Sequence, residues 1–184
     1  MGGNKGVERP TDFQQYLKEF PQGCYRDVAK FRIRSLVPEL ATLQVDANFV
    51  EDQWRSGKQA EWVDFDGGRS IELIRIRPAA DDGKILVEYT CNSAGYGESS
   101  WVSNWELCHP RGPRPMQNFQ VRLRGNWSDF YDLIIKCSTR EQPSDSKRDH
   151  GPVVNGGSCG VAGGTTRTFL YRIWVEARRK PSFN

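Results

Sequence analysis

Apolar and polar residues alternate with a period of two over much of this sequence, and this pattern constrains the fold more than any other feature. Phe119, Val121 and Leu123 alternate with polar residues, and similar alternation occupies 85–91 and 169–175. Such alternation is typical of strands that have one buried and one exposed face. The sequence therefore predicts a mainly β protein.

A similar order of elements occurs three times between residues 60 and 178. Each unit has a loop, a strand, a turn and a further strand, and the units begin near Trp62, Trp101 and Asn155. One unit alone would leave an apolar face uncovered, so the three are expected to close around a shared core. The predicted architecture is a three-unit β-prism over 60–178, with a two-sheet β-sandwich as the alternative.

A helical hairpin is expected before the β-domain, over residues 11–40. Its apolar residues follow helical spacing, Thr11 and Gln14 have the spacing of a capping box, and Pro21 with Gly23 interrupts the pattern. The other predicted segments are a flexible N-terminus over 1–10, a linker over 41–59 and a solvated basic C-terminal tail over 179–184.

Composition excludes several classes of partner and cofactor. The 184 residues include 26 basic and 23 acidic ones, for a net charge of +3, which is not the charge of a nucleic-acid binder. No apolar run is long enough for membrane insertion, and the first ten residues contain no signal-peptide core. Phosphate-loop, dinucleotide and EF-hand motifs are absent, so no cofactor or metal is expected.

Catalytic chemistry has little support in the sequence. His109 and His150 both lie in loop-like sequence, and His109 follows Cys108 directly, where neighbouring side chains on an extended chain point to opposite sides. The carboxylates of Asp64 and Asp66 are candidates for glycoside chemistry or calcium binding, and we rank them lowest. The chain is therefore expected not to be an enzyme.

A carbohydrate site is predicted in the loop-rich stretch from Tyr96 to Glu106. Tyr96, Trp101 and Trp105 supply aromatic faces, with Asn104 and Glu106 beside them. A sugar ring needs apolar stacking and partners for its hydroxyl groups, and these residue types supply both. The alternative is that the tryptophans pack in the core, which is favoured for Trp105 and for Trp127.

The middle unit resembles the vitelline membrane outer layer protein family. The resemblance rests on the W-x-x-x-W spacing of Trp101 and Trp105, on Cys108 followed by Pro110 and Gly112, and on the phrases FQVRL and DLIIKC. It implies a three-fold β-prism similar to the jacalin lectins and an extracellular, carbohydrate-associated role. The first unit lacks the leading cysteine and the third lacks the closing one. The spacing of glycine and tryptophan is also similar to the hydrophobic tryptophan repeats of clostridial surface proteins.

The stretch TDFQQYLKEFPQGCYRDVAKFRIRSL resembles the helix pairs of tetratricopeptide-type repeats and those that accompany bacterial caspase-like enzymes. This resemblance implies an alternative function, a protein-interaction module that joins a larger partner or parent chain. Phe13, Tyr16 and Phe31 are the expected contact residues.

The five cysteines allow two interpretations. Cys108 begins the loop of the middle unit and Cys137 closes its second strand, so a disulfide between them would tie the two ends of that unit together, and Cys91 could then pair with Cys159. Cys24 would remain an unpaired thiol. Such disulfides imply an extracellular or periplasmic location, whereas cysteines that only fill the core imply a reduced, cytoplasmic protein.

Overall fold

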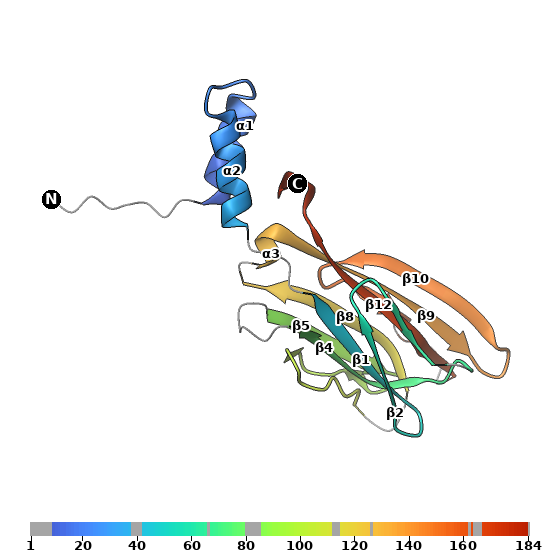
Figure 1. Ribbon diagram of the computed structural model, residues 1–184. Coiled ribbons are helices and arrows are strands. Elements are labelled where there is room, and N and C mark those ends of the chain that lie inside the picture. Colours follow the sequence, from blue (N-terminus) through green and yellow to red (C-terminus); the bar gives the residue numbers. More distant parts are fainter. Residues whose placement is uncertain are drawn as a thin grey trace. The chain divides into compact units, whose positions relative to one another are not determined.

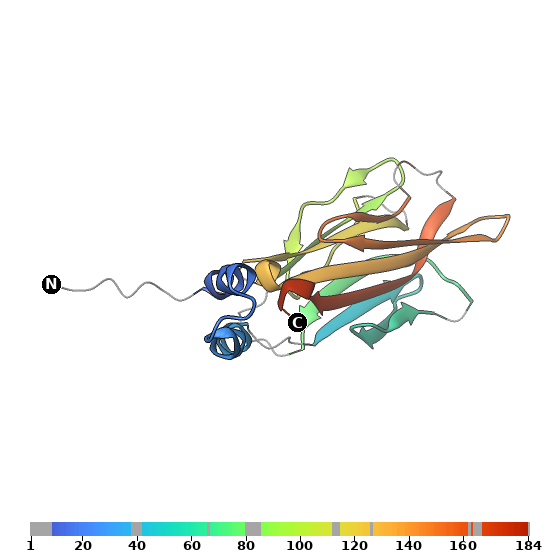
Figure 2. The ribbon, with the colours of Figure 1, turned by 90° about the horizontal axis from the view of Figure 1, so that it is seen from above.

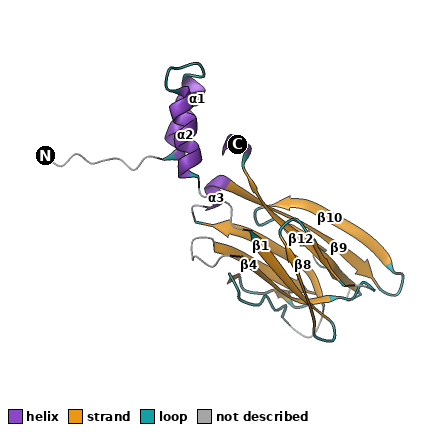
Figure 3. Ribbon diagram, viewed as in Figure 1, coloured by secondary structure: helices purple, strands orange, loops and turns teal. Residues whose placement is uncertain are grey.

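The computed structural model describes residues 9–37, 42–65, 67–79, 86–111, 115–125, 127–161, 163 and 167–183. The chain divides into two compact units, each described by itself below. The smaller unit comprises residues 1–40 and 179–184, and the larger one comprises 41–178. Figure 1 labels their elements, and Figure 3 shows that the larger unit consists mainly of strands.

The smaller unit is a hairpin of two helices, α1 (Pro10–Glu19) and α2 (Arg26–Leu36). The helices lie side by side in both views (Figures 1 and 2). Helix α1 begins one residue before Thr11, because Pro10 suits the first turn and Asp12 accepts a hydrogen bond from the Arg9 amide at 3.2 Å. The helical hairpin is confirmed, but the capping box predicted at Thr11 and Gln14 is wrong. Residues 1–8 of the predicted flexible N-terminus lie outside the described residues.

The C-terminal segment also belongs to the smaller unit. A short 3-10 helix, η1 (Pro181–Phe183), buries the side chain of Phe183, and Gln14 donates from Nε2 to the carbonyl oxygen of Ser182 at 2.6 Å. The predicted solvated tail over 179–184 is therefore wrong. The aromatic ring of Phe183 gives this segment an apolar group to bury, despite the basic residues that precede it.

Sheet A of the larger unit is antiparallel and has the strand order β2-β1-β4. Its strands are β1 (Leu43–Phe49), β2 (Gln53–Lys58) and β4 (Ile71–Pro78). The predicted linker over 41–59 is therefore wrong, because most of it forms β1 and β2. The missed signal is a period-two apolar pattern in β1, whose buried members are Leu43, Val45, Ala47 and Phe49.

Two further antiparallel sheets complete the larger unit. Sheet B has the order β10-β9-β12-β3 and contains β3 (Trp62–Asp64), β9 (Tyr131–Glu141), β10 (Ser146–Val154) and β12 (Thr168–Arg179). Sheet C has the order β11-β8-β5-β6, with β7 also paired to β5. Its strands are β5 (Leu86–Ser93), β6 (Gly97–Glu98), β7 (Val102–Ser103), β8 (Met116–Arg124) and β11 (Ser158–Gly160). A short helix, α3 (Trp127–Phe130), connects β8 to β9.

The mainly β class is confirmed, and the sheets pack in a sandwich-like manner in which each lies against both of the others. The strand pairing does not follow the three predicted units. Strands β4 and β5, both assigned to the first unit, lie in sheets A and C, while β3 pairs with β12 from the far end of the domain. Residues 60–178 thus fold together with β1 and β2.

The core lies between the three sheets, as the alternation in the sequence predicts. Eight side chains on the apolar sides of the predicted strands are all buried: Val87, Tyr89, Phe119, Val121, Leu133, Ile135, Tyr171 and Ile173. Tyr89 shows how a polar group is accommodated there. Its hydroxyl donates to the carbonyl oxygen of Glu106, and burial raises the pKa of Tyr89 to about 12.

Two disulfides connect the sheets, and their pairing differs from the predicted one. Cys91 pairs with Cys108, and Cys137 pairs with Cys159, with Cα–Cα distances of 6.1 and 6.0 Å. The four cysteines were identified correctly and Cys24 is the exposed free thiol, but the pairs Cys108–Cys137 and Cys91–Cys159 are wrong. The prediction had one disulfide close the middle unit and the other join the two outer units, whereas each observed disulfide joins two neighbouring units.

The disulfide pairing predicts the result of peptide mapping without reduction. Linked peptides should contain Cys91 with Cys108 and Cys137 with Cys159, while Cys24 should react with a thiol reagent in the folded protein. The sequence separation is 17 residues in the pair Cys91–Cys108 and 22 residues in the pair Cys137–Cys159. Replacing either pair by alanine should lower the free energy of unfolding by about 3 kcal/mol on a chain-entropy estimate, measured by urea denaturation. A peptide linking Cys108 to Cys137 would contradict this topology.

Candidate functional site

The predicted site between Tyr96 and Glu106 lies on a segment that passes from sheet C to sheet A. Strand β7 pairs with β5 of sheet C, and Cys108 then exchanges backbone hydrogen bonds with Ile74 of sheet A, at 2.9 and 3.3 Å. The disulfide from Cys108 to Cys91 fixes the end of the segment. This stretch is therefore an ordered connection between two sheets.

Trp101 and Trp105 form two aromatic platforms on this segment. Each has 36% of its surface exposed. The guanidinium of Arg122 in sheet C lies 3.9 Å from the ring centre of Trp101, and that of Arg77 in sheet A lies 4.1 Å from the ring centre of Trp105. The core packing favoured for Trp105 is thus wrong. The two rings stack on arginines of different sheets.

The two polar residues predicted beside these rings accept hydrogen bonds from backbone amides of the protein. Asn104 accepts a hydrogen bond from the Val87 amide through Oδ1 at 2.8 Å, and Glu106 accepts one from the Ser103 amide through Oε2 at 2.6 Å. Between them, Trp105 has a φ of 69°, in the left-handed region. Tyr96 is 42% exposed, in the turn between β5 and β6.

A cation over the ring is common to nearly all the tryptophans. In the part of the chain that the structure describes, five of the six have an arginine or lysine within 6 Å of a ring centre: Trp54 with Arg75, Trp62 with Arg172, Trp101 with Arg122, Trp105 with Arg77 and Trp174 with Lys136. The exception is Trp127, which is buried as predicted and stacks on Tyr131. Cation–π contacts of this kind are favourable by about 0.5–1 kcal/mol at exposed positions.

A buried carboxylate of sheet A positions the two arginines of β4. Asp46, with 2% of its side chain exposed, accepts hydrogen bonds from Arg75 at 2.8 and 3.0 Å and from Ser56 at 2.7 Å, and lies 3.5 Å from Arg77. Burial by itself raises the pKa of Asp46, but these hydrogen bonds, a further one from Gln44 and the charge of Arg77 outweigh it, so the pKa lies below its usual value. Asp46 thereby fixes the arginines that stack on Trp54 and Trp105.

A notch that was not predicted from the sequence lies between two sheet edges. It lies where β2, at the edge of sheet A, meets β3, at the edge of sheet B. Its volume is about 270 Å³, and the side chains that line it are Arg55, Ser56, Trp62, Val63 and Asp64. A β-carbon on Gly57 would lie 2.7 Å from Cγ2 of Val63, so the close approach of the two strands requires glycine there.

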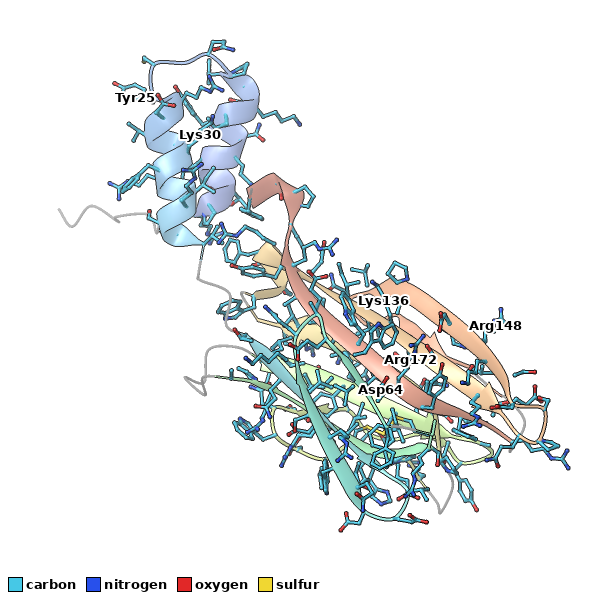
Figure 4. The ribbon with its side chains drawn as sticks, turned by 45° about the vertical axis from the view of Figure 1, so that its right-hand side comes forward. Tyr25, Lys30, Asp64, Lys136, Arg148 and Arg172 are labelled. Carbon is cyan, nitrogen blue, oxygen red and sulfur yellow. A yellow bond between two sulfur atoms is a disulfide. The ribbon has the colours of Figure 1, made fainter. Side chains whose placement is uncertain are left out.

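Trp62 is the aromatic wall of this notch. It is 38% exposed, and the guanidinium of Arg172 lies 4.4 Å from its ring centre. Trp62 is also the cross-strand partner of Trp174, which carries the ammonium group of Lys136 at 4.1 Å. Figure 4 shows Lys136, Arg172 and Asp64 on the neighbouring strands β9, β12 and β3.

Polar side chains of β9 and β10 hold Arg172 in place over Trp62. Its Nε donates to Ser138 at 2.8 Å and its Nη2 pairs with Asp149 at 3.0 Å. The hydrogen bond from Ser138, followed by that from Arg172, holds the pKa of Asp149 below its usual value. Arg172 therefore stacks on Trp62 as a fixed and largely neutralised cation.

A larger hollow of about 520 Å³ lies elsewhere in this unit, lined in part by Arg69, Arg140 and Arg167. Arg69 pairs with Glu51, and Arg140 pairs with Asp145 and donates to the carbonyl oxygen of Gly67 at 2.6 Å. Two of its three arginines are therefore already occupied. The hollow offers no aromatic platform comparable to Trp62.

The residues weighed for catalysis do not form a recognisable constellation in the described part of the chain. Nδ1 of His109 lies 2.9 Å from the carbonyl oxygen of Pro110. His150 contacts the hydroxyl of Thr139 at 2.8 Å, and burial lowers its pKa. Asp64 lines the notch, and Asp66 lies outside the described residues. No group of three or more potential metal ligands occurs among the residues described, nor is any described helix long and apolar enough to span a membrane.

Comparison with known proteins gives no match: no family model, no curated protein and no solved structure is similar to this chain.

The carboxylate of Asp46 predicts an acid-sensitive contribution to stability. Because its pKa is lower in the folded protein, the stabilisation is complete above its unfolded value, near 3.8, and is lost as the pH falls through the folded value. Asp46→Asn should reduce the free energy of unfolding by about 2–3 kcal/mol at pH 7, and the difference from the wild type should shrink at pH 3. Urea denaturation at both pH values measures this.

Asp149→Asn is the matched control, since this carboxylate pairs with an arginine but has 73% of its side chain exposed. Its effect should stay below about 1 kcal/mol. A difference for Asp46→Asn that does not change between pH 7 and pH 3 would contradict the proposed role of its charge.

Proposed function

We propose that this protein is a non-catalytic, lectin-like module that binds carbohydrate at a cell surface or in a matrix, and that the notch at Trp62 is its binding site. The observation that carries the proposal is the combination of an exposed indole with charged and hydroxyl side chains in one hollow of about 270 Å³. A sugar ring stacks its C–H face on an aromatic ring and directs its hydroxyl groups to polar partners.

Each residue of the notch has a distinct role in this proposal. Trp62 supplies the stacking face. Arg172 lies over its ring, and 38% of the surface of the residue still faces solvent. The carboxylate of Asp64 accepts from sugar hydroxyls, and the hydroxyl of Ser56, which donates to Asp46, accepts from a further one. Both strands are parts of sheets, so these groups are fixed before a ligand arrives, which reduces the entropic cost of binding.

The location of the protein is part of the same proposal. Two disulfides are typical of proteins from oxidising compartments, which supports an extracellular or periplasmic location over a cytoplasmic one. The resemblance of the middle unit to the vitelline membrane outer layer protein family favours a carbohydrate-associated role as well. The site proposed here lies on β3 and β2, however, and not in the segment that carries that resemblance.

Substitution of Trp62 tests the proposal. Trp62→Ala should weaken binding to glycans identified on an array by at least about tenfold, because it removes the stacking face. Isothermal titration calorimetry with a soluble oligosaccharide from the array measures the loss. Circular dichroism should be unchanged, since Trp62 is at a sheet edge and partly exposed.

Trp54→Ala is the control, because Trp54 is also 38% exposed and carries an arginine but does not line the notch. It should leave glycan affinity unchanged. Trp101→Ala separates the two candidate sites: loss of binding there, with Trp62→Ala still active, would place the site on sheet C and refute the notch. The absence of any glycan binding would refute the lectin-like function itself.

A second candidate function rests on the helical hairpin. Four of its apolar residues are more than half exposed: Phe20, Tyr25, Val28 and Phe31. Of the three predicted contact residues, Phe31 is exposed to 66%, whereas Phe13 and Tyr16 are only partly exposed and Tyr16 packs on Phe20. Exposed apolar side chains at this density are typical of interaction surfaces. Tyr25 and Lys30 mark this unit in Figure 4.

For this alternative, Phe31→Ser should abolish co-purification of a specific protein partner while leaving the helical signal in circular dichroism intact. Val154→Ser is the control, because Val154 is 47% exposed on β10 of the larger unit. Equal recovery of the partner with wild type and with both variants would count against the hairpin as the interaction surface.

A further inference from the structure

We infer that the notch at Trp62 selects an anionic sugar, one whose ring carries a carboxylate or a sulfate group. The inference rests on the proposed lectin-like function and adds to it the class of ligand. It follows from how the cations of the larger unit are paired.

Most arginines that stack on tryptophan in this protein are neutralised by a carboxylate. Arg172 pairs with Asp149 at 3.0 Å, Arg122 pairs with Glu88 at 2.7 Å, and Arg75 pairs with Asp46 at 2.8 Å. These arginines can stabilise an indole, and each already has a carboxylate partner, although Asp46 is shared with Arg77 and Glu88 with Arg124. A ligand would gain little from displacing an existing carboxylate.

Arg55 in the notch is different. Its guanidinium donates from Nη1 to the backbone carbonyl of Trp54 at 3.1 Å and lies 4.4 Å from the ring centre of Phe65. These two contacts orient the side chain, but neither carries a negative charge. Among the residues that the structure describes, no carboxylate forms an ion pair with Arg55. The notch therefore contains an oriented arginine whose charge is uncompensated.

Lys136 adds a second uncompensated cation on the same sheet face as the tryptophan pair. It is held over Trp174, the cross-strand neighbour of Trp62, and it has no carboxylate partner in the described part of the chain. The positive charge around Trp62 thus comes from two directions, from Arg55 on β2 and from Lys136 on β9. This arrangement attracts a negatively charged ligand to the stacking face.

Asp64 also lines the notch, and it does not pair with Arg55. The notch therefore presents a carboxylate and a guanidinium that remain apart. Sugar hydroxyls can donate to Asp64, while a sugar carboxylate or sulfate accepts charge-assisted hydrogen bonds from Arg55. A neutral sugar satisfies only the first of these groups, whereas an anionic sugar satisfies both.

The test uses two matched pairs of probes with the full chain. Hexameric oligogalacturonate is compared with its methyl ester, and a heparin hexasaccharide is compared with its desulfated form. The charged member of at least one pair should bind at least about tenfold more tightly at 50 mM NaCl, and the difference should shrink at 500 mM NaCl because salt screens the contact. The pair that shows the difference identifies carboxylate or sulfate as the anion.

Two variants locate the charge. Arg55→Gln should reduce the affinity for the charged probe to about that of its neutral counterpart, and Lys136→Gln should reduce it less, because Lys136 does not line the notch. Lys18→Gln is the control for net charge, since Lys18 belongs to the smaller unit. It should have no effect.

The possible failures can be told apart. Equal binding of charged and neutral probes, with both lost in Trp62→Ala, overturns the anionic class but leaves the lectin-like function standing. A preference for the charged probe that survives in Arg55→Gln also overturns the inference, because the notch is then not the source of the preference. If none of the four probes binds and no array glycan does, the proposed function fails together with the inference.

Discussion

The larger unit depends on one row of buried side chains in sheet C. Phe119 on β8 is the cross-strand partner of Cys91 on one side and of Cys159 on the other, and all three are almost fully buried. From this row one disulfide reaches Cys108, which bonds to the edge strand β4 of sheet A, and the other reaches Cys137 on β9 of sheet B. From the two sides of a single phenylalanine, sheet C is thus linked by a disulfide to sheet B, and by a disulfide followed by backbone hydrogen bonds to sheet A.

This arrangement leaves the junction between sheets A and B, in the part of the chain that the structure describes, without a disulfide on either side of it. There β2 meets β3, and the strands are brought together by the close approach of Gly57 to Val63. Backbone hydrogen bonds from Gln59 to Leu43 at 2.8 Å and from Ala60 to Val175 at 2.9 Å hold the connecting turn. The notch at Trp62 lies at this junction. Two edge strands whose side chains are not fully packed against each other leave room for a ligand that a disulfide-closed junction would not provide.

The sequence allowed a correct prediction of the elements but not of their partners. Period-two alternation identified the buried faces of β5, β8, β9 and β12, because each of these strands has one apolar side. The pairing of strands could not be predicted in this way, since β3 pairs with β12 across more than a hundred residues and only the folded sheets bring them together. The predicted disulfides failed for the same reason. One was expected to close the middle unit and the other to join the outer units. Each observed disulfide instead joins neighbouring units, Cys91 with Cys108 and Cys137 with Cys159, because the strand pairing brings these residues together.

The candidate site shows the same limit at the level of single residues. The aromatic residues between Tyr96 and Trp105 are prominent in the sequence because they are clustered, whereas Trp62 is separated by most of the domain from its neighbours Arg172 and Trp174. The composition nevertheless contained part of the signal for contacts between cations and tryptophans, since the chain has many arginines together with six tryptophans.

What distinguishes a structural cation from a recognition cation is its pairing. Stacked cations reduce the exposure of indoles on sheet faces and edges, where uncovered apolar surface favours association with other chains, and this role alone explains Arg75, Arg122 and Arg172. Each of these pairs with a carboxylate. A protein that needed cations only to cover aromatic rings would have the same reason to pair Arg55, over Phe65, and Lys136, over Trp174, with carboxylates. That these two are oriented yet uncompensated beside Trp62 is therefore the feature that favours a ligand over a purely structural role.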